Sequence, residues 1–152
     1  MHVLHLTWEY PPLVYGGIGR HVPALAAAQA ARGDRATVVT QRPEGAPAHE
    51  TQAGVTIIRV DPDGPFPYHL PSLLTWVGAL DARIGNAACE VADVDVVHAH
   101  DCLYMGSALA AAACKATGTP LVLTQHVGYV PFGKALDLVQ ELAYRTLGRS
   151  VL

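Results

Sequence analysis

The chain has 152 residues and a mass of 16.1 kDa, the usual size of one domain. Half of its residues are hydrophobic (51%) and only 15% are charged, against about 25% in an average soluble domain, so the composition excludes a disordered chain and indicates a large buried core. Its net charge of -3, with no cluster of lysines and arginines, argues against a nucleic-acid partner.

Apolar strands alternate with helical segments along the whole chain. In chain order the sequence predicts a strand at 2–7, a helix at 18–32, strands at 36–40 and 55–60, a helix at 72–91, a strand at 95–99, a helix at 103–117, a strand at 120–124 and a helix at 135–149. Residues 36–40 form a β-branched run without polar alternation, which is typical of a strand buried on both faces of a parallel sheet. The breaker-rich stretches 41–54 and 61–71 are expected to be irregular. We therefore expect an α/β fold, a Rossmann-like doubly wound parallel sheet with helices on both faces.

The three cysteines, Cys89, Cys102 and Cys114, are odd in number and never spaced as C-x-x-C. They are expected to be free thiols rather than part of a disulfide framework or a zinc site. Residues 1–8 lack a basic segment and a cleavage site, and no stretch is apolar enough to span a bilayer, so a cytoplasmic location is expected.

The last residues, 148–152, continue an apolar helical pattern without a glycine, proline or cap behind it. This pattern predicts that 1–152 is one domain of a larger fold.

Ligands of doubly wound folds bind outside the carboxyl ends of the parallel strands. In this chain those ends are followed by residues 8–20, 98–101 and 124–128, where the unusual polar residues gather. These three stretches are the candidate site.

The first stretch contains a glycine-rich turn before a helix. At Gly16 and Gly17 the missing side chains let backbone N–H groups approach an anion, and the start of the helix favours negative charge. The spacing matches neither G-x-G-x-x-G nor the P-loop, so a simple tight turn remains the alternative. Arg20 and His21 in the first helical turn are candidates to contact the same anion, and a solvated arginine is the alternative for Arg20.

Histidines mark the other two stretches. His98 and His100 point to the same side of a strand end, because side chains two apart share a face. This H-x-H spacing occurs in zinc hydrolases, but Asp101 stands at the wrong offset for the longer metal motif, and a structural His98 is the competing interpretation. His126 directly follows an apolar strand, and its ring is expected to face the glycine-rich turn.

The first loop also offers a carboxylate, Glu9, beside the aromatic rings of Trp8 and Tyr10. Aromatic rings there serve recognition or packing, and both interpretations of Tyr10 remain open.

Together these segments resemble the N-terminal half of a family-4 retaining glycosyltransferase of the GT-B architecture, in which two Rossmann-like domains face each other across a cleft. The resemblance rests on Trp8-Glu9-Tyr10-Pro11-Pro12, Gly16-Gly17-Ile18-Gly19-Arg20-His21-Val22, Val96-Val97-His98-Ala99-His100-Asp101 and Leu123-Thr124-Gln125-His126. The first segments are similar to glycogen and maltosyl synthases, and residues 125–131 are more similar to lipid- or polysaccharide-directed members.

The resemblance implies a set of roles. The backbone of Gly16 and Gly17 would approach the diphosphate of a nucleotide-sugar donor, and His126 would be the catalytic residue that hydrogen-bonds the donor sugar near the reacting carbon. The acceptor side would be lined by Glu9, Tyr10, Arg20, His21, His100 and Asp101. The family transfers a hexosyl group with retention to a carbohydrate or lipid-linked acceptor and uses no metal or other cofactor.

The resemblance also implies a partner domain. The nucleotide pocket and the main cations of the family lie in a C-terminal domain with an E-x₇-E motif, which this sequence does not contain, so the isolated chain is expected to be inactive. Peripheral membrane association is compatible with lipid-linked acceptors. Two other functions stay open: a metal-dependent hydrolase that uses His98, His100 and His126, and a non-catalytic α/β binding module.

Overall fold

The computed structural model describes residues 1–62, 64, 70–102, 105–126, 128, 131 and 133–149. Its elements, in chain order, are β1 (His2–Leu6), α1 (Ile18–Ala31), β2 (Arg35–Gln41), β3 (His49–Gln52), β4 (Val55–Val60), α2 (Leu70–Cys89), β5 (Val96–His100), α3 (Met105–Thr117), β6 (Leu121–Thr124), α4 (Lys134–Ala143) and a π-helical turn (Tyr144–Gly148). In the described part of the chain, no helix combines the length and hydropathy needed to cross a membrane.

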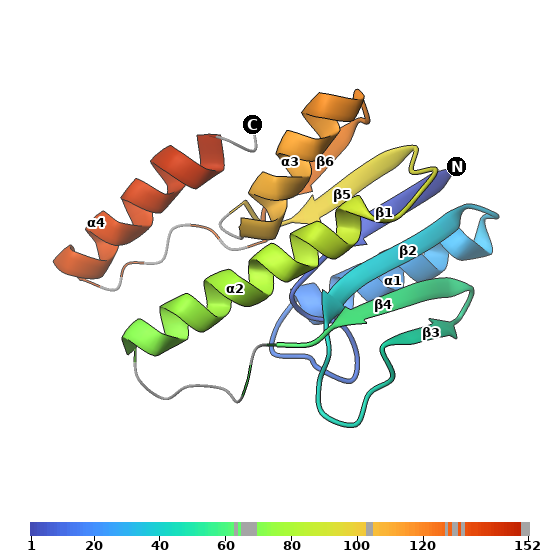
Figure 1. Cartoon of the computed structure of the whole chain (residues 1–152), viewed down its shortest axis with the longest axis horizontal. Helices are drawn as coiled ribbons and strands as arrows, with labels where there is room; N and C mark the ends of the chain where they lie inside the picture. The colour runs from blue at the N-terminus through green and yellow to red at the C-terminus, as the bar shows by residue number, and fades with distance from the viewer. Residues whose placement is uncertain are drawn as a thin grey trace.

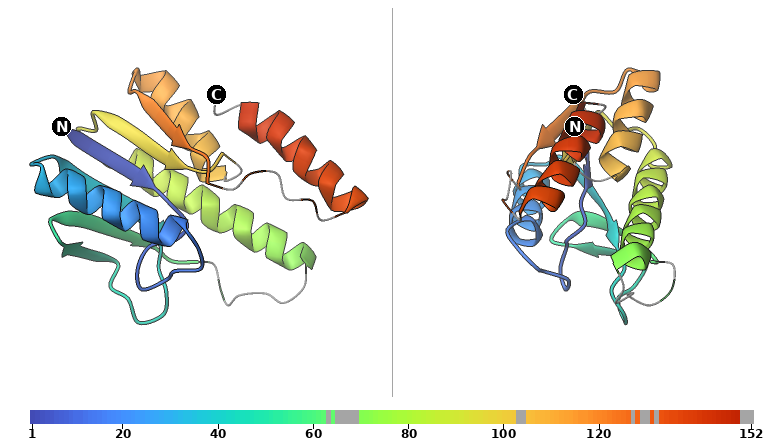
Figure 2. Two further views of the ribbon diagram at one scale, coloured as in Figure 1. Left: turned by 180° about the vertical axis from the view of Figure 1, so that it is seen from behind. Right: turned by 90° about the vertical axis from the view of Figure 1, so that its left-hand side faces the viewer.

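The strands form one sheet in the order β3-β4-β2-β1-β5-β6. All neighbours pair in parallel except β3, which pairs with β4 in antiparallel fashion. Helix α1 covers one face of this sheet, and α2 and α3 cover the other, as the views in Figures 1 and 2 show. The predicted doubly wound sheet with helices on both faces is confirmed.

Two apolar cores fill the layers on either side of the sheet, because successive strand residues point to opposite faces. Between the sheet and α1 lie Val38, Val55 and Ile57, packed with Val22 and Ala26 of the helix. On the α2 and α3 side the core is built from Leu4, Leu6, Val39, Leu80, Ile84 and Ala110 together with their neighbours. The carboxyl ends of β1, β5 and β6 therefore lie together at one edge of the sheet, the edge formed by strand ends, with α1 on one face and α3 on the other.

The expectation that residues 41–54 are irregular is wrong for His49–Gln52, which form the edge strand β3. The strand is polar because only its partner β4 is buried, so it lacks an apolar signal. Its hairpin turn places Ala53 at φ 50° and Gly54 at φ 78°, the two positive φ values that a tight two-residue turn requires.

Two helix boundaries also differ from the prediction. Helix α2 begins at Leu70, inside the stretch 61–71 that was expected to be irregular, with Pro71 in its first turn, where a missing N–H is tolerated. At the C-terminus α4 ends at Ala143 and gives way to the π-helical turn instead of running to residue 149. Residues 65–69 and 150–152 lie outside the described part of the chain.

Candidate functional site

Five of the eight histidines gather at the carboxyl edge of the sheet, on the face that α1 covers. They are His5 of β1, His21 of α1, His98 and His100 of β5, and His126, which follows β6. The parallel register pairs His5 with His98, and the two-residue strand period places His100 one step nearer the edge. Strand order therefore brings together rings that are up to 121 residues apart in sequence.

A continuous chain of hydrogen bonds links Gln29 and three of these histidines from the inside outwards. Gln29 Oε1 lies 2.7 Å from His5 Nε2, His5 Nδ1 lies 3.2 Å from His100 Nε2, and His100 Nδ1 lies 3.0 Å from His126 Nε2. An amide oxygen only accepts, so His5 Nε2 donates to it, and each neutral ring then accepts on one nitrogen and donates on the other. The chain thereby assigns the Nε2–H tautomer to His5, His100 and His126 alike.

Burial keeps this cluster uncharged. Desolvation is the main cause that lowers the pKa of His98 from 6.5 to about 4 and that of His100 from 6.5 to about 2, and the neighbouring histidines lower both further. Desolvation also lowers the pKa values of His5 and His126. The carboxylates of Asp101 and Glu9 act in the opposite direction on His126, without cancelling the effect of its burial. At neutral pH these four rings are therefore neutral donors and acceptors.

The glycine-rich turn faces a carboxylate of its own chain. Glu9 Oε2 accepts the backbone N–H groups of Tyr15 (2.9 Å), Gly16 (2.7 Å) and Gly19 (3.3 Å). A Cβ atom at Gly19 would lie 2.9 Å from this oxygen and 3.2 Å from Cα of Val14, so a side chain there would force the Glu9 carboxylate and the turn to shift. The turn is thus an anion-binding nest that holds the carboxylate of Glu9, and the contact of Gly16 with a diphosphate stays a prediction.

Donors remain beside Glu9 at the start of α1. In the described part of the chain, nothing accepts from the backbone N–H of Gly17 or Ile18, and the exposed side chain of Arg20 has no hydrogen-bond or ion-pair partner. His21, one residue on, is exposed, and its ring centre lies 5.1 Å from that of His126. The predicted residues Gly17, Arg20, His21 and His126 therefore lie at one edge and face solvent at least in part.

Three other predicted residues are buried in this chain. Tyr10 is 4% exposed and packs in the α1 core, His100 is 1% exposed behind His126, and Asp101 is 2% exposed. Asp101 Oδ1 accepts from Gln125 Nε2 at 2.9 Å, and Gln125 Oε1 accepts the backbone N–H of Cys102 at 3.0 Å. The geometry gives these residues positioning contacts rather than an open surface.

His98 matches the structural interpretation, because its Nε2 lies 2.7 Å from Thr124 Oγ1 on the neighbouring strand. The sequence reasoning missed His5 and Gln29, which extend the histidine chain into the core. A usable signal for His5 was present: a titratable ring in the middle of an apolar strand needs a polar partner. No comparable signal marks Gln29, which is one polar residue in a helix.

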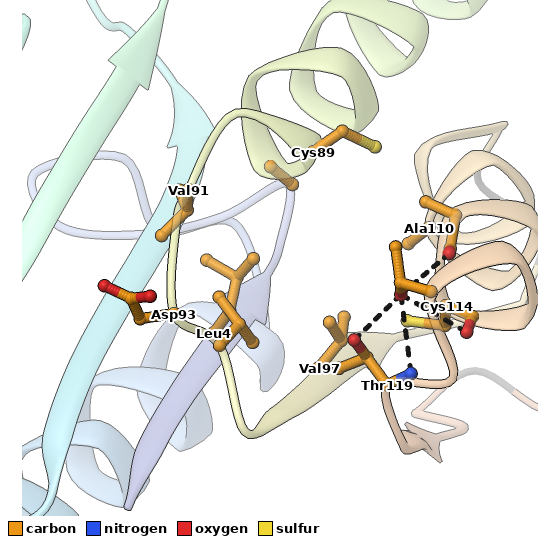
Figure 3. A pocket seen from close by; sticks show the side chains of 12 residues that line it. Leu4, Cys89, Val91, Asp93, Val97, Ala110, Cys114 and Thr119 are labelled. Atoms are coloured by element: carbon orange, nitrogen blue, oxygen red, sulfur yellow. Dashed lines mark hydrogen bonds between the residues drawn. The ribbon is translucent and has the colours of Figure 1, made fainter.

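A separate apolar cavity of about 280 Å³ lies at the opposite edge of the sheet, between the ends of α2 and α3 (Figure 3). It is lined by Val97 near the amino end of β5 and by Asp93 and Thr119, which precede β5 and β6. Thr117 Oγ1 bonds Thr119 Oγ1 at 2.8 Å and the carbonyl of Ala113 at 3.0 Å, so its polar group is satisfied within the wall. The cavity is therefore a packing space remote from the histidine cluster.

Comparisons with known proteins identify the family to which this chain is similar. The family model described as Glycosyltransferase Family 4 matches residues 15–151. A glycogen synthase of Mycobacterium tuberculosis is 33% identical over 141 residues, which cover 83% of this chain and 33% of that protein. An uncharacterized glycosyltransferase of Methanocaldococcus jannaschii is 31% identical over 105 residues, covering 66% of this chain and 25% of that protein. The chain thus spans a third or less of the length of these relatives.

Among solved structures, a sucrose-phosphate synthase from Thermosynechococcus elongatus superposes on 99% of this chain and 40% of its own, with a TM-score of 0.60. Its sequence identity is 16%, so this likeness concerns the fold.

Proposed function

The chain belongs to Glycosyltransferase Family 4, and on that premise we propose that it forms the acceptor-side half of the cleft of a retaining glycosyltransferase. The enzyme would move a hexosyl group from a nucleotide-diphosphate sugar to a carbohydrate or lipid-linked acceptor. A second, nucleotide-binding domain would complete the cleft, and the isolated chain would not turn over. The three free cysteines support a reducing, cytoplasmic setting for this reaction.

One observation carries the proposal: the open N–H groups at the start of α1 lie at the same sheet edge as His126. Backbone donors at a helix start suit a phosphate, and a neutral imidazole suits a sugar hydroxyl. The contact with the diphosphate would come from Gly17 and Ile18, because Gly16 already donates to Glu9. Gly16 would act indirectly by holding the turn in shape.

Glu9 has a second effect on the proposed donor site. Its carboxylate places a negative charge next to the position of a diphosphate, so it disfavours a dianion unless cations lie close by. Arg20 is the cation that this chain offers there. The remaining positive charge would come from the second domain, which explains why transfer requires both halves.

In the transfer step the leaving diphosphate gains negative charge. The fixed N–H dipoles of Gly17 and Ile18, together with Arg20, would stabilise that charge without reorganising. His126 presents Nδ1 as an acceptor, since its Nε2–H is donated to His100, and would orient a hydroxyl of the donor sugar. No metal ion takes part in this scheme.

A titration of the ¹⁵N-labelled chain with nucleotide-diphosphate sugars tests the donor contact. We expect millimolar binding, with amide shifts concentrated at Gly17, Ile18 and His126. Gly17→Ala should abolish these shifts without unfolding the chain, because its Cβ meets no atom within 4 Å. Gly78→Ala in α2, which is equally free of contacts, is the matched control. Shifts that persist unchanged in Gly17→Ala would contradict the assignment.

The catalytic role of His126 needs the enzyme that contains this domain. There, His126→Ala should lower kcat by about 10²-fold or more while the unfolding midpoint of the domain changes little, because the ring is only partly buried. The anomeric configuration of the product, read by NMR, tests retention. An unchanged kcat in His126→Ala would remove His126 from the mechanism.

A further inference from the structure

Three imidazoles from three separate elements converge at the open end of the histidine cluster: His21, His100 and His126. One ring nitrogen of each lies within 4.8 Å of the others. Their ring centres are 5.1 Å (His21 to His126), 5.2 Å (His100 to His126) and 6.0 Å (His21 to His100) apart. We propose that this triad binds a divalent transition-metal ion of the zinc class through three histidine nitrogens, with the fourth position open.

The spacing fits a tetrahedral ion. Zinc–nitrogen bonds of about 2.0–2.1 Å place neighbouring ligand nitrogens about 3.3 Å apart. His100 Nδ1 and His126 Nε2 are 3.0 Å apart, close to this spacing, and the ion would replace their mutual hydrogen bond once the two rings turn so that both nitrogens point to it. His21 completes the set from the first turn of α1, where its exposed side chain is free to change rotamer.

The hydrogen bonds behind the triad hold His100 in the tautomer that a metal needs. Histidine ligands of metals donate their other N–H to a fixed acceptor, which fixes the ring and leaves the ligating nitrogen unprotonated. Here His100 Nε2–H points to His5 Nδ1, and His5 Nε2–H points to Gln29 Oε1. The lone pair of His100 Nδ1 therefore faces His126 and the proposed ion.

The donor set selects the class of ion. Imidazole nitrogens suit zinc, copper, nickel and iron, whereas magnesium and calcium require oxygen ligands. The negative charges of Glu9 and Asp101, which act on His126 through space, also favour a cation at this point. The proposed sugar transfer needs no ion, and an ion on His126 Nε2 would compete with the proposed contact between His126 and the donor sugar.

A second group of nitrogens, on His5, His98 and His100, is also compact but is the poorer site. The rings of His98 and His100 are stacked, 4.2 Å apart and inclined by only 28°, so their lone pairs run side by side instead of converging. His98 Nε2 is also engaged with Thr124. The ion therefore belongs to the outer triad. An H-x-H motif would use His98 and His100 as ligands, and here His21 replaces His98.

The test is metal binding by the untagged, chelator-stripped chain, followed by calorimetry with Zn²⁺ and by the visible absorption of Co²⁺. We expect one ion per chain and a tetrahedral Co²⁺ spectrum. His21→Ala, which alters an exposed residue, should weaken binding about tenfold or more, and Gln29→Leu should weaken it by about 10–100-fold as an outer-shell loss. His49→Ala, an exposed histidine on β3, is the control and should bind like the unaltered chain.

Three results would overturn the proposal: no binding at a tenfold excess of Zn²⁺, binding that is equal in the unaltered chain and in His21→Ala, or loss of binding in His98→Gln while His21→Ala retains it. The last result would place the ion in the inner group. Circular dichroism of each variant separates loss of binding from loss of fold. None of these readouts depends on sugar transfer.

Discussion

Acidification from pH 7 to pH 5 is expected to destabilise the metal-free chain by about 4 kcal/mol. The cause lies in two histidines whose pKa burial depresses, His98 from 6.5 to about 4 and His100 from 6.5 to about 2. Below pH 6.5 the unfolded chain takes up a proton at each ring while the folded chain does not. The stability that depends on these two neutral rings is therefore fully present above pH 6.5. It is lost progressively as the pH falls from 6.5 to about 4 for His98 and to about 2 for His100.

The magnitude follows from the proton uptake. Each ring that stays neutral changes the free energy of unfolding by about 1.4 kcal/mol per pH unit below 6.5, or about 2 kcal/mol between pH 7 and pH 5. Urea unfolding followed by circular dichroism at pH 7, 6 and 5, with a chelator present, measures it. His98→Gln should roughly halve the pH dependence, and His49→Ala should leave it unchanged. If the free energy of unfolding of the unaltered chain falls by less than about 1 kcal/mol between pH 7 and pH 5, the cluster is protonated or hydrated in the folded chain.

The remaining predictions concern packing and the buried ion pair, and urea unfolding at pH 7.5 measures each. Gly19→Ala should cost about 1–3 kcal/mol, because its Cβ would lie 2.9 Å from Glu9 Oε2, whereas Gly17→Ala should stay within about 0.5 kcal/mol; equal losses would refute the close approach. Leu80→Ala should cost about 2–5 kcal/mol, since the side chain is fully buried, and a smaller loss would mean that the core closes around the cavity. Glu50→Gln should cost about 2–3 kcal/mol, because Arg59, whose side chain is 1% exposed, loses its ion pair with a carboxylate that is 33% exposed. Replacing both Glu50 and Arg59 by apolar residues should recover part of the lost free energy of unfolding. If nothing is recovered, the two side chains stabilise the fold by more than the attraction between their charges.

Much of the fold was predictable because its signals are local. The short β-branched run 36–40 in β2 indicates a strand buried in a parallel sheet, and the glycines after α1 and α3 mark helix ends, with φ values of 94° at Gly33 and 76° at Gly118. Strand β3 escaped prediction because an edge strand needs no apolar face. It is held to the sheet by its antiparallel pairing with β4 and by the ion pair between Glu50 and Arg59.

Most members of the candidate site, except His5 and Gln29, were predictable, but their contacts were not. The rule that ligands bind at the carboxyl ends of parallel strands selected the turn around Gly16, the strand end at His100 and the residue His126. The sequence placed Glu9 on the acceptor side, but it gave no sign that this carboxylate occupies the N–H groups of the turn, since hydrogen bonding across a loop depends on its backbone path.

The sequence by itself determined the alternation of strands and helices, the family resemblance and the edge at which the candidate site lies, because each of these depends on patterns over a few neighbouring residues. Only the tertiary structure decided which nitrogens meet. His5 and His100 are 95 residues apart and touch because β1 pairs with β5, and His21 joins His126 because α1 lies over that edge. Such contacts follow from strand order and layer packing, which no local pattern specifies.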